Sequence, residues 1–363
     1  MSADFLIVGG GLIGLATAER LLQHGASVAI LERGEVGREA SWAGGGILSP
    51  LCPWHYSDEV TRLTQHGARL FPAWTQTLFA ETGINPEYEV SGMLVLPPLD
   101  LQAAERWCAA HDMPLVLGAD AADYGVQGQS PALFLPNIAQ VRNPRLLCAL
   151  RQSVESLGGV ITERCTVIDI VAKRARVESL LTNNGSLSAG GYIVTAGAWS
   201  TGVLGRHALR LEIGPMRGQM LLFKFDAPPL LHIVLQDDLY LIPRRDGHLL
   251  VGSTLEDVGF DSSTTDDARD SLWRDATKIL PSLRDKAPVK HWAGLRPGSL
   301  HNIPTIGQHP ELNNLYLNSG HFRYGVTMAP ASAEILINEI TGARQPFDAV
   351  SYTHLTLPTI YSV

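Results

Sequence analysis

The alternation of apolar and polar positions near the start of the chain predicts a strand, a helix and a second strand in close succession. Residues 5–8 form a short apolar run of the kind found in buried parallel strands. Residues 15–23 place apolar side chains at helical spacing, and residues 27–31 form a second apolar run that stops at Glu32. We therefore expect a βαβ unit here.

The pattern farther along the chain predicts two kinds of domain. Apolar runs predict strands at 92–96, 132–135 and 165–170, a helix over 144–157, antiparallel strands at 219–225, 239–243 and 248–253, and a helix over 266–280. On an alternating strand over 239–243, Tyr240 and Ile242 face one way and Leu239 and Leu241 the other. The order of the elements predicts an α/β fold, in which a Rossmann-like dinucleotide-binding domain is interleaved with a smaller antiparallel-sheet α+β substrate domain.

The chain is expected to cross between these domains several times. The residues assigned to the dinucleotide-binding domain are 1–87, 143–214 and 294–350, and those assigned to the substrate domain are 88–142 and 215–293. Residues 351–363 bring in β-branched side chains without a partner segment, after the natural stop of the last helix. We expect them to be a disordered or non-native tail.

Glycines recur at the first turn with the spacing Gly9-x-Gly11-x-x-Gly14. Gly9 permits the tight turn, Gly11 lets backbone N–H groups approach a pyrophosphate, and Gly14 lets the helix pack closely on the strand. The helix N-terminus then faces the phosphate charge, and Glu32 can accept hydrogen bonds from an unphosphorylated adenosine ribose. A glycine-rich turn alone is often only a turn, but the turn, the three elements and the acid together predict dinucleotide binding.

Three later segments favour a flavin over a nicotinamide cofactor. Residues 39–53 are small and glycine-rich where a nicotinamide enzyme would continue its βα pattern. Residues 192–200 predict a strand that ends in small residues, suited to a close approach to a cofactor. Residues 320–330 lead into an apolar helix over 332–340, whose N-terminus can stabilise negative charge on a flavin ring.

The chain resembles the D-amino acid oxidase family of FAD-dependent amine oxidoreductases over roughly residues 4–348, and within it the glycine oxidases of the thiamine-pathway type. The motifs that carry the resemblance are, in order, VGGGLIGLATAERLL, SWAGGGILSP, YIVTAGAWS, GPMRGQM, YLIPRRDGHLLVGST, GLRP and GHFRYGVTMAP. The resemblance implies a Rossmann-like FAD-binding domain. The residues it implies for FAD binding, beside those of the first turn and Glu32, are Leu12, Ile13, Arg33, Ser41, Ala43, Gly44, Gly45, Gly46, Val167, Ala196, Gly197, Trp199, Arg296, His321, Arg323, Tyr324, Gly325, Val326 and Thr327.

Four residues are candidates for contact with a small amino-acid substrate. The resemblance makes Arg296 the carboxylate-binding residue, since a guanidinium pairs with a carboxylate through two hydrogen bonds. It makes Tyr240 a hydrogen-bond donor to the same carboxylate, places Arg323 between cofactor and substrate, and makes Leu255 a limit on side-chain size. Without the resemblance, Arg296 could be a surface arginine, Tyr240 an ordinary sheet tyrosine and Leu255 a residue of the core. Asp238 departs from the expected pattern and leaves the substrate preference open.

Composition excludes several other classes of protein. A formal net charge of -8 without basic clusters argues against a nucleic-acid partner. No apolar run reaches the length of a membrane span, and the cysteines and histidines have no metal-ligand spacing, so we expect a soluble, cytoplasmic protein without a metal. All four cysteines lie before residue 166, so a thioether link to flavin of the sarcosine-oxidase-like type is not available and we expect non-covalent FAD.

Two hypotheses for the function remain at this point. In the first, the protein is an oxidase that converts glycine, sarcosine or D-alanine to the oxo acid, ammonia or amine, and hydrogen peroxide, with a role in thiamine thiazole biosynthesis. In the second, it is a D-amino acid or glycine dehydrogenase subunit, of the cyanide-forming or opine type, that passes electrons to a partner instead of molecular oxygen. The resemblance also implies a homo-oligomer, namely a tetramer.

Overall fold

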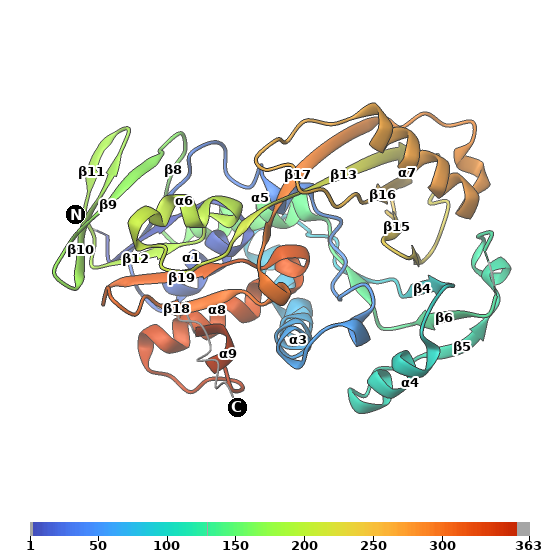
Figure 1. Ribbon diagram of the computed structural model, residues 1–363, viewed down its shortest axis with the longest axis horizontal. Helices are drawn as coiled ribbons and strands as arrows, with labels where there is room; N and C mark the ends of the chain where they lie inside the picture. Colours follow the sequence, from blue (N-terminus) through green and yellow to red (C-terminus); the bar gives the residue numbers. More distant parts are fainter. Residues whose placement is uncertain (1–2, 129, 354–363) are drawn as a thin grey trace.

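Two large sheets lie side by side along the long axis of the molecule (Figure 1). The structure is a computed structural model and describes residues 3–128 and 130–353. Within those residues, no helix is both long enough and apolar enough to cross a bilayer. The two sheets belong to the two kinds of domain that the sequence predicts.

The first sheet is mostly parallel. Its strands, in spatial order, are β18 (Thr305–Gln308), β19 (Leu315–Ser319), β12 (Gly191–Val194), β1 (Phe5–Val8), β2 (Val28–Leu31) and β8 (Val160–Thr162). Only β18 runs antiparallel to its neighbour. The predicted βαβ unit is confirmed: β1 and β2 are parallel neighbours, and α1 (Leu12–Gln23) connects them.

Both faces of this sheet are covered, which explains why its strands are apolar throughout. Three helices cover one face, namely α1, α5 (Asn143–Ser156) and α8 (Gly325–Thr341), and α3 (Asp58–Thr82) packs against α5 and α8. The other face packs against a three-stranded sheet of β9 (Val167–Lys173), β10 (Arg176–Thr182) and β11 (Gly185–Leu187), and against α6 (Ser200–Leu204). Along β1, Ile7 points to the helices, whereas Leu6 and Val8 point to the small sheet.

One predicted strand belongs to a different sheet from the one expected. The apolar run at 165–170 leads into β9, which pairs with β10 in antiparallel fashion and is not part of the parallel sheet. The short strand β8 takes that place instead, beside β2.

The second sheet is mostly antiparallel. Its strands, in spatial order, are β17 (Lys290–Gly298), β13 (Gly214–Lys224), β16 (His248–Gly252), β15 (Leu239–Pro243), β14 (Ile233–Gln236), β4 (Met93–Leu96), β6 (Ala132–Leu135) and β5 (Val116–Ala119). Five of these strands were expected from the sequence. β17, however, pairs with β13 along its whole length, so the domain boundary predicted between residues 293 and 294 falls inside a strand of this sheet.

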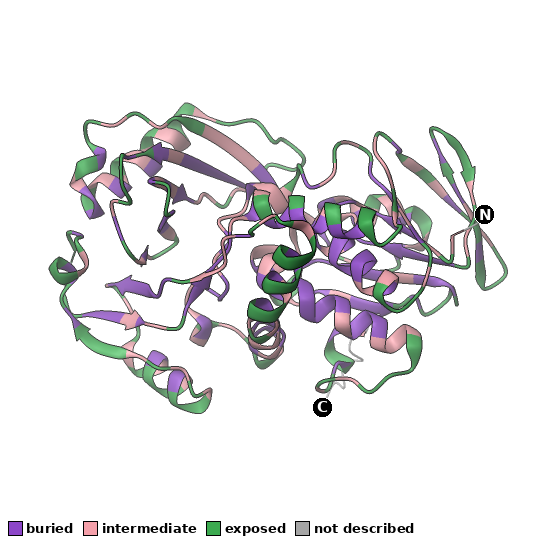
Figure 2. Cartoon of the chain, turned by 180° about the vertical axis from the view of Figure 1, so that it is seen from behind, coloured by how far each residue is buried: buried purple, intermediate pink, exposed green. Residues whose placement is uncertain are grey.

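The two faces of the second sheet have different surroundings. Helix α7 (Asp266–Ile279) covers one face, to which Leu241 contributes. Tyr240 and Ile242 face the other way, as predicted from the alternation. Tyr240 is therefore directed away from α7. Figure 2 shows the buried residues of both sheets and of the helices between them.

The remaining elements are short. They are α2 (Ala40–Ala43), β3 (Glu89–Val90), α4 (Leu101–Ala110), β7 (Ala139–Gln140) and α9 (Val350–Thr353). Helix α9 corrects the expectation of a tail from residue 351, because Tyr352 is buried and its hydroxyl donates to the carbonyl of Glu59 at 2.6 Å. The rest of the expected tail, residues 354–363, lies outside the described residues.

Candidate functional site

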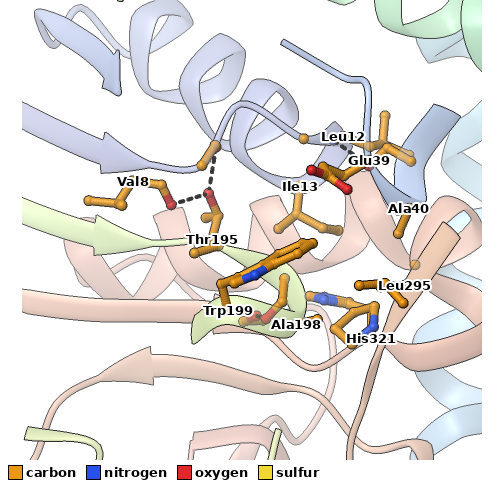
Figure 3. A pocket seen from close by; sticks show the side chains of 18 of the residues that line it. Val8, Leu12, Ile13, Glu39, Ala40, Thr195, Ala198, Trp199, Leu295 and His321 are labelled. Carbon is orange, nitrogen blue, oxygen red and sulfur yellow. Dashed lines mark hydrogen bonds between the residues drawn. The ribbon is translucent and has the colours of Figure 1, made fainter. Parts of the chain in front are cut away.

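A large pocket opens at the carboxyl ends of the parallel strands, where ligands bind in sheets of this type. Val8 of β1, Leu31 of β2 and Thr195 after β12 line it, and the empty space, including the open mouth, is about 1210 Å³. Figure 3 shows Ile13 on one side of this pocket and Trp199 and His321 across from it.

The glycines of the first turn have separate tasks. A Cβ at Gly14 would lie 2.0 Å from the carbonyl oxygen of Gly9, so Gly14 serves helix packing and does not line the pocket. A Cβ at Gly9 would lie 2.6 Å from the carbonyl oxygen of Thr195, and Gly9 has φ +110°. Gly11 faces the pocket, where its missing side chain leaves Ser41 as the nearest group. Backbone N–H groups are thus accessible at the start of α1.

Glu32 is buried at the edge of this pocket and also holds the first turn together. One carboxylate oxygen accepts from the N–H of Gly10 and the other from the N–H of Gly34, both at 2.8 Å. A carboxylate has about four lone-pair positions, so acceptor capacity remains for a ribose. The sequence did not predict the two backbone contacts.

Two buried polar atoms on the pocket wall have no hydrogen-bond partner among residues 3–128 and 130–353. They are Oδ1 of Asn318 and Nδ1 of His321, and both residues line the pocket. The other ring nitrogen of His321 contacts the hydroxyl of Ser332 at 2.9 Å. Burial lowers the pKa of His321 to about 3, so its ring is neutral at physiological pH. Since unpaired buried polar atoms are costly, these two atoms are suited to a polar ligand.

Most of the residues predicted to bind the cofactor line the large pocket. They are Gly9, Gly11, Leu12, Ile13, Glu32, Arg33, Ser41, Gly44, Val167, Ala196, Gly197, Trp199, Arg296, His321, Arg323, Gly325 and Val326. Gly45, Gly46 and Tyr324 line a neighbouring pocket instead, while Gly14, Ala43 and Thr327 line neither. The sequence analysis missed several residues of the wall, among them Glu39, Ala40, Thr195, Leu295 and Asn318.

The neighbouring pocket is smaller and continuous with the large one. Gly44, Arg296, Arg323 and Val326 line both, and the empty space of the smaller pocket is about 540 Å³. Its wall also includes Tyr240, which is 8% exposed. The structure therefore brings together three of the four residues predicted to contact substrate.

Arg296 has a fixed position but no anionic partner. Its guanidinium donates to the hydroxyl of Ser253 at 2.6 Å and to the carbonyl of Thr254 at 3.2 Å. Among the described residues, no carboxylate forms an ion pair with it. Burial lowers the pKa of Arg296, and the nearby Arg323 lowers it further, while Tyr240 raises it. An arginine remains protonated under these conditions, so a half-buried positive charge is available to an anion.

Tyr240 and Arg323 approach the small pocket from opposite domains. The hydroxyl of Tyr240 lies 3.9 Å from the sulfur of Met220 and close to the guanidinium of Arg296, and it can donate to a ligand. Arg323 donates to the Asp238 carboxylate at 2.9 Å. Burial opposes the charge of Arg323, but Asp238 outweighs burial and raises the pKa of the guanidinium. Asp238, whose identity was unexpected, thus acts as the counter-ion of Arg323.

The structure does not place Leu255 in the site. Its side chain is 43% exposed and lines neither pocket. After β16 ends at Gly252, the chain stays beside β13 through a backbone bridge between Arg217 and Glu256, and the buried Arg217 side chain also binds the Glu256 carboxylate. The role of Leu255 in limiting substrate size stays a prediction that these two pockets do not support. Ile47 and Leu51 line the small pocket instead, and both come from the glycine-rich segment noted in the sequence.

The described residues contain no group of three or more side chains that could hold a metal ion. The arrangement that the structure does contain is a long pocket with a glycine turn and a helix N-terminus, joined to a small pocket with an unpaired guanidinium. Such a site can bind a dinucleotide beside a small anion.

Comparisons with known proteins agree with this geometry. A glycine oxidase from Pseudomonas putida is 42% identical over 97% of this chain and 98% of its own length. A bifunctional protein ThiO/ThiG from a Synechocystis species is 32% identical over 92% of this chain and 51% of its own length. The crystal structure of glycine oxidase from Geobacillus kaustophilus superposes with a TM-score of 0.92, at 26% identity over 98% of both chains.

The family profile described as FAD dependent oxidoreductase (DAO) matches residues 4–339. The large pocket fits this cofactor, because its wall offers a glycine-rich turn at a helix N-terminus, a buried carboxylate and two polar atoms that have no partner among the described residues. The fold is the expected one, a Rossmann-like domain interleaved with an antiparallel substrate domain. This chain belongs to the DAO family of FAD-dependent oxidoreductases.

Proposed function

We propose that this protein is an amino-acid oxidase that uses non-covalently bound FAD to convert glycine, sarcosine or D-alanine to the oxo acid, ammonia or amine, and hydrogen peroxide. The observation that carries the proposal is the position of Arg296, whose unpaired guanidinium lines both the cofactor-sized pocket and the small pocket beside it. The names of the glycine oxidases that this chain resembles support the choice of substrate.

The residues of the small pocket are suited to hold a short amino acid. Arg296 pairs with the substrate carboxylate, and the Tyr240 hydroxyl donates a second hydrogen bond to it. A Cβ at Gly45 would lie 2.6 Å from the side chain of Ile242, so this glycine lets the loop approach the strand of Tyr240. Ile47 and Leu51 restrict the remaining space.

The charges in this pocket also favour the form of substrate that reacts. When bound, FAD supplies an acceptor for the hydride of the substrate α-carbon. That transfer needs an uncharged amine, and the positive charge of Arg296 lowers the pKa of a nearby ammonium. The contacts to the carboxylate fix the orientation of the α-carbon, which is the main contribution that the protein makes to such a reaction.

We assign FAD binding to the large pocket. The start of α1 faces the pyrophosphate, Glu32 accepts from the ribose, and Asn318 and His321 offer polar atoms to the ring end. The cysteine that lines this pocket is Cys165, whose backbone N–H donates to the carbonyl of Glu32 at 2.8 Å, at the end assigned to the ribose, which supports non-covalent binding. Acid precipitation should release yellow flavin into the supernatant; flavin retained in the pellet would contradict non-covalent binding.

The physiological setting follows from the resemblance. We propose a cytoplasmic homotetramer that serves thiamine thiazole biosynthesis. The partial match to a bifunctional protein ThiO/ThiG supports this role. Deletion of the gene should then create a thiamine requirement that added thiazole relieves.

The direct test of the oxidase proposal is to measure oxygen consumption and hydrogen peroxide with the purified protein. Glycine, sarcosine and D-alanine should each yield one peroxide per oxygen consumed. The alternative, a dehydrogenase subunit that passes electrons to a partner, predicts reduction of an artificial dye without peroxide. Activity with the dye alone would overturn the oxidase proposal.

A further inference from the structure

The small pocket contains three charged side chains, and their arrangement bears on which substrates it accepts. Arg296 has no anionic partner among the described residues, whereas Arg323 donates to Asp238 at 2.9 Å. All three line the same pocket. The pocket therefore holds one neutralised guanidinium and one free guanidinium.

The two members of the ion pair differ in their access to solvent. The Arg323 side chain is 17% exposed and the Asp238 side chain is 66% exposed. Asp238 lies in the turn between β14 and β15, whereas Arg323 lies on the cofactor-domain segment Phe322–Tyr324 that precedes α8. Loss of Asp238 would thus leave a largely buried cation without a counter-ion, and such a cation attracts any anion that reaches it.

We propose that Asp238 determines specificity by occupying Arg323, so that the pocket accepts amino acids with a single carboxylate and rejects those with a second anionic group. This inference rests on the proposed function for the identity of the first carboxylate site, at Arg296. The second anionic group of a dicarboxylate would have to compete with Asp238 for Arg323 and would also be repelled by Asp238. A monocarboxylate meets neither obstacle.

Sarcosine and iminodiacetate form a matched pair of probes for this rule. Both are secondary amines with one carboxymethyl group, and iminodiacetate differs by one additional carboxylate. Acetate and malonate form the corresponding pair of non-reacting ligands, whose binding to the FAD-loaded protein is measured by calorimetry. The two pairs separate turnover from binding.

The variant that tests the rule is Asp238→Asn. It should tighten malonate relative to acetate by about tenfold, the lower end of what one new charge-assisted hydrogen bond contributes. The ratio of kcat/KM for iminodiacetate over sarcosine should rise by a similar factor. In the double variant Asp238→Asn/Arg323→Gln, the gain in malonate binding should disappear because the receiving guanidinium is gone.

The adjacent acid provides the control. Asp237 is exposed, lines neither pocket and has φ +52°, a conformation that asparagine tolerates well. Asp237→Asn removes the same charge one residue away without touching Arg323. It should leave the malonate-to-acetate ratio within about twofold of the wild type, since exposed charges contribute little.

An unchanged malonate-to-acetate ratio in Asp238→Asn would overturn the proposal, and so would an equal rise in Asp237→Asn. Persistence of the gain in the double variant would also overturn it. Oxidation of sarcosine by the wild type is measured separately. If the binding ratios change as expected but the wild type does not oxidise sarcosine, the charge rule holds and the proposed function fails.

Discussion

The substitution Gly218→Ala tests whether the position of Arg296 is essential for activity. Gly218 lies on β13 beside β17, and the guanidinium of Arg296 lies over it. A Cβ at residue 218 would be 2.1 Å from one terminal nitrogen of Arg296 and 2.4 Å from the guanidinium carbon. Because ordinary contacts of this kind begin at about 3.4 Å, the guanidinium has to move by more than about 1 Å.

This displacement should affect activity far more than stability. The clashing atoms are the far end of a flexible side chain, so the protein can relax by moving Arg296 away from Ser253 and Thr254. A misplacement of about 1 Å costs roughly a hundredfold in rate, which corresponds to about 2.7 kcal/mol. We therefore expect kcat/KM for glycine to fall by about two decades, while the unfolding midpoint changes little.

The matched control is Gly214→Ala on the same strand, where an added Cβ would meet no atom within 4 Å. Steady-state kinetics, flavin content and thermal unfolding are measured for both variants and the wild type. Only Gly218→Ala should lose activity, and both should retain FAD. Wild-type activity in Gly218→Ala, or equal losses in the two variants, would refute the assignment of Arg296 as the carboxylate-binding residue.

Three other outcomes are expected. Arg296→Ala should lower kcat/KM for amino acids by about 3 kcal/mol, roughly a hundredfold, because the substrate carboxylate loses its charged partner. Arg296→Lys should recover part of this loss, and an equal loss for amines without a carboxylate would show a structural role. Glu32→Gln should weaken FAD by about 1.5 kcal/mol, since one acceptor loses its charge; unchanged affinity by flavin fluorescence would disprove the ribose assignment. Burial lowers the pKa of His321 to about 3, so the unfolded chain binds one more proton than the folded chain between about pH 3 and 6.5. The free energy of unfolding should therefore decline as pH falls through this window. Urea unfolding of His321→Gln should show a shallower decline with pH, and a decline equal to that of the wild type would contradict burial of the neutral ring.

The sequence predicted the parts of the fold that depend on local patterns. The first βαβ unit and the two faces of β15 follow from apolar periods of two and 3.6 residues, which are visible within a few residues. The long helix α3 was missed although it has local signals, namely Asp58 and Glu59 in its first turn and a left-handed Gly83 after its end. Pro72 inside this helix interrupts the helical pattern, because proline is disfavoured in a helix interior.

The rest of the site depends on contacts between distant segments. Strand β17 belongs to the second sheet because it pairs with β13, which precedes it by more than sixty residues. The Asp238–Arg323 pair joins residues 85 positions apart. Leu255 was assigned by resemblance, whereas the position of its segment depends on the contact of Glu256 with Arg217 on β13. Neither spacing nor composition carries this information.

The course of β17 has a consequence for attempts to recombine this protein with its relatives. The strand pairs with β13 in the substrate sheet, and three consecutive residues of it, Leu295, Arg296 and Pro297, form part of the wall of the cofactor pocket. In a chimaera with its crossover at residue 293, the two parents would each contribute part of β17. Arg296, the proposed carboxylate-binding residue, would then be misaligned with the cofactor pocket. Exchange of the substrate domain should therefore carry the whole of β13 and β17 as one unit, with the junction placed after Gly298.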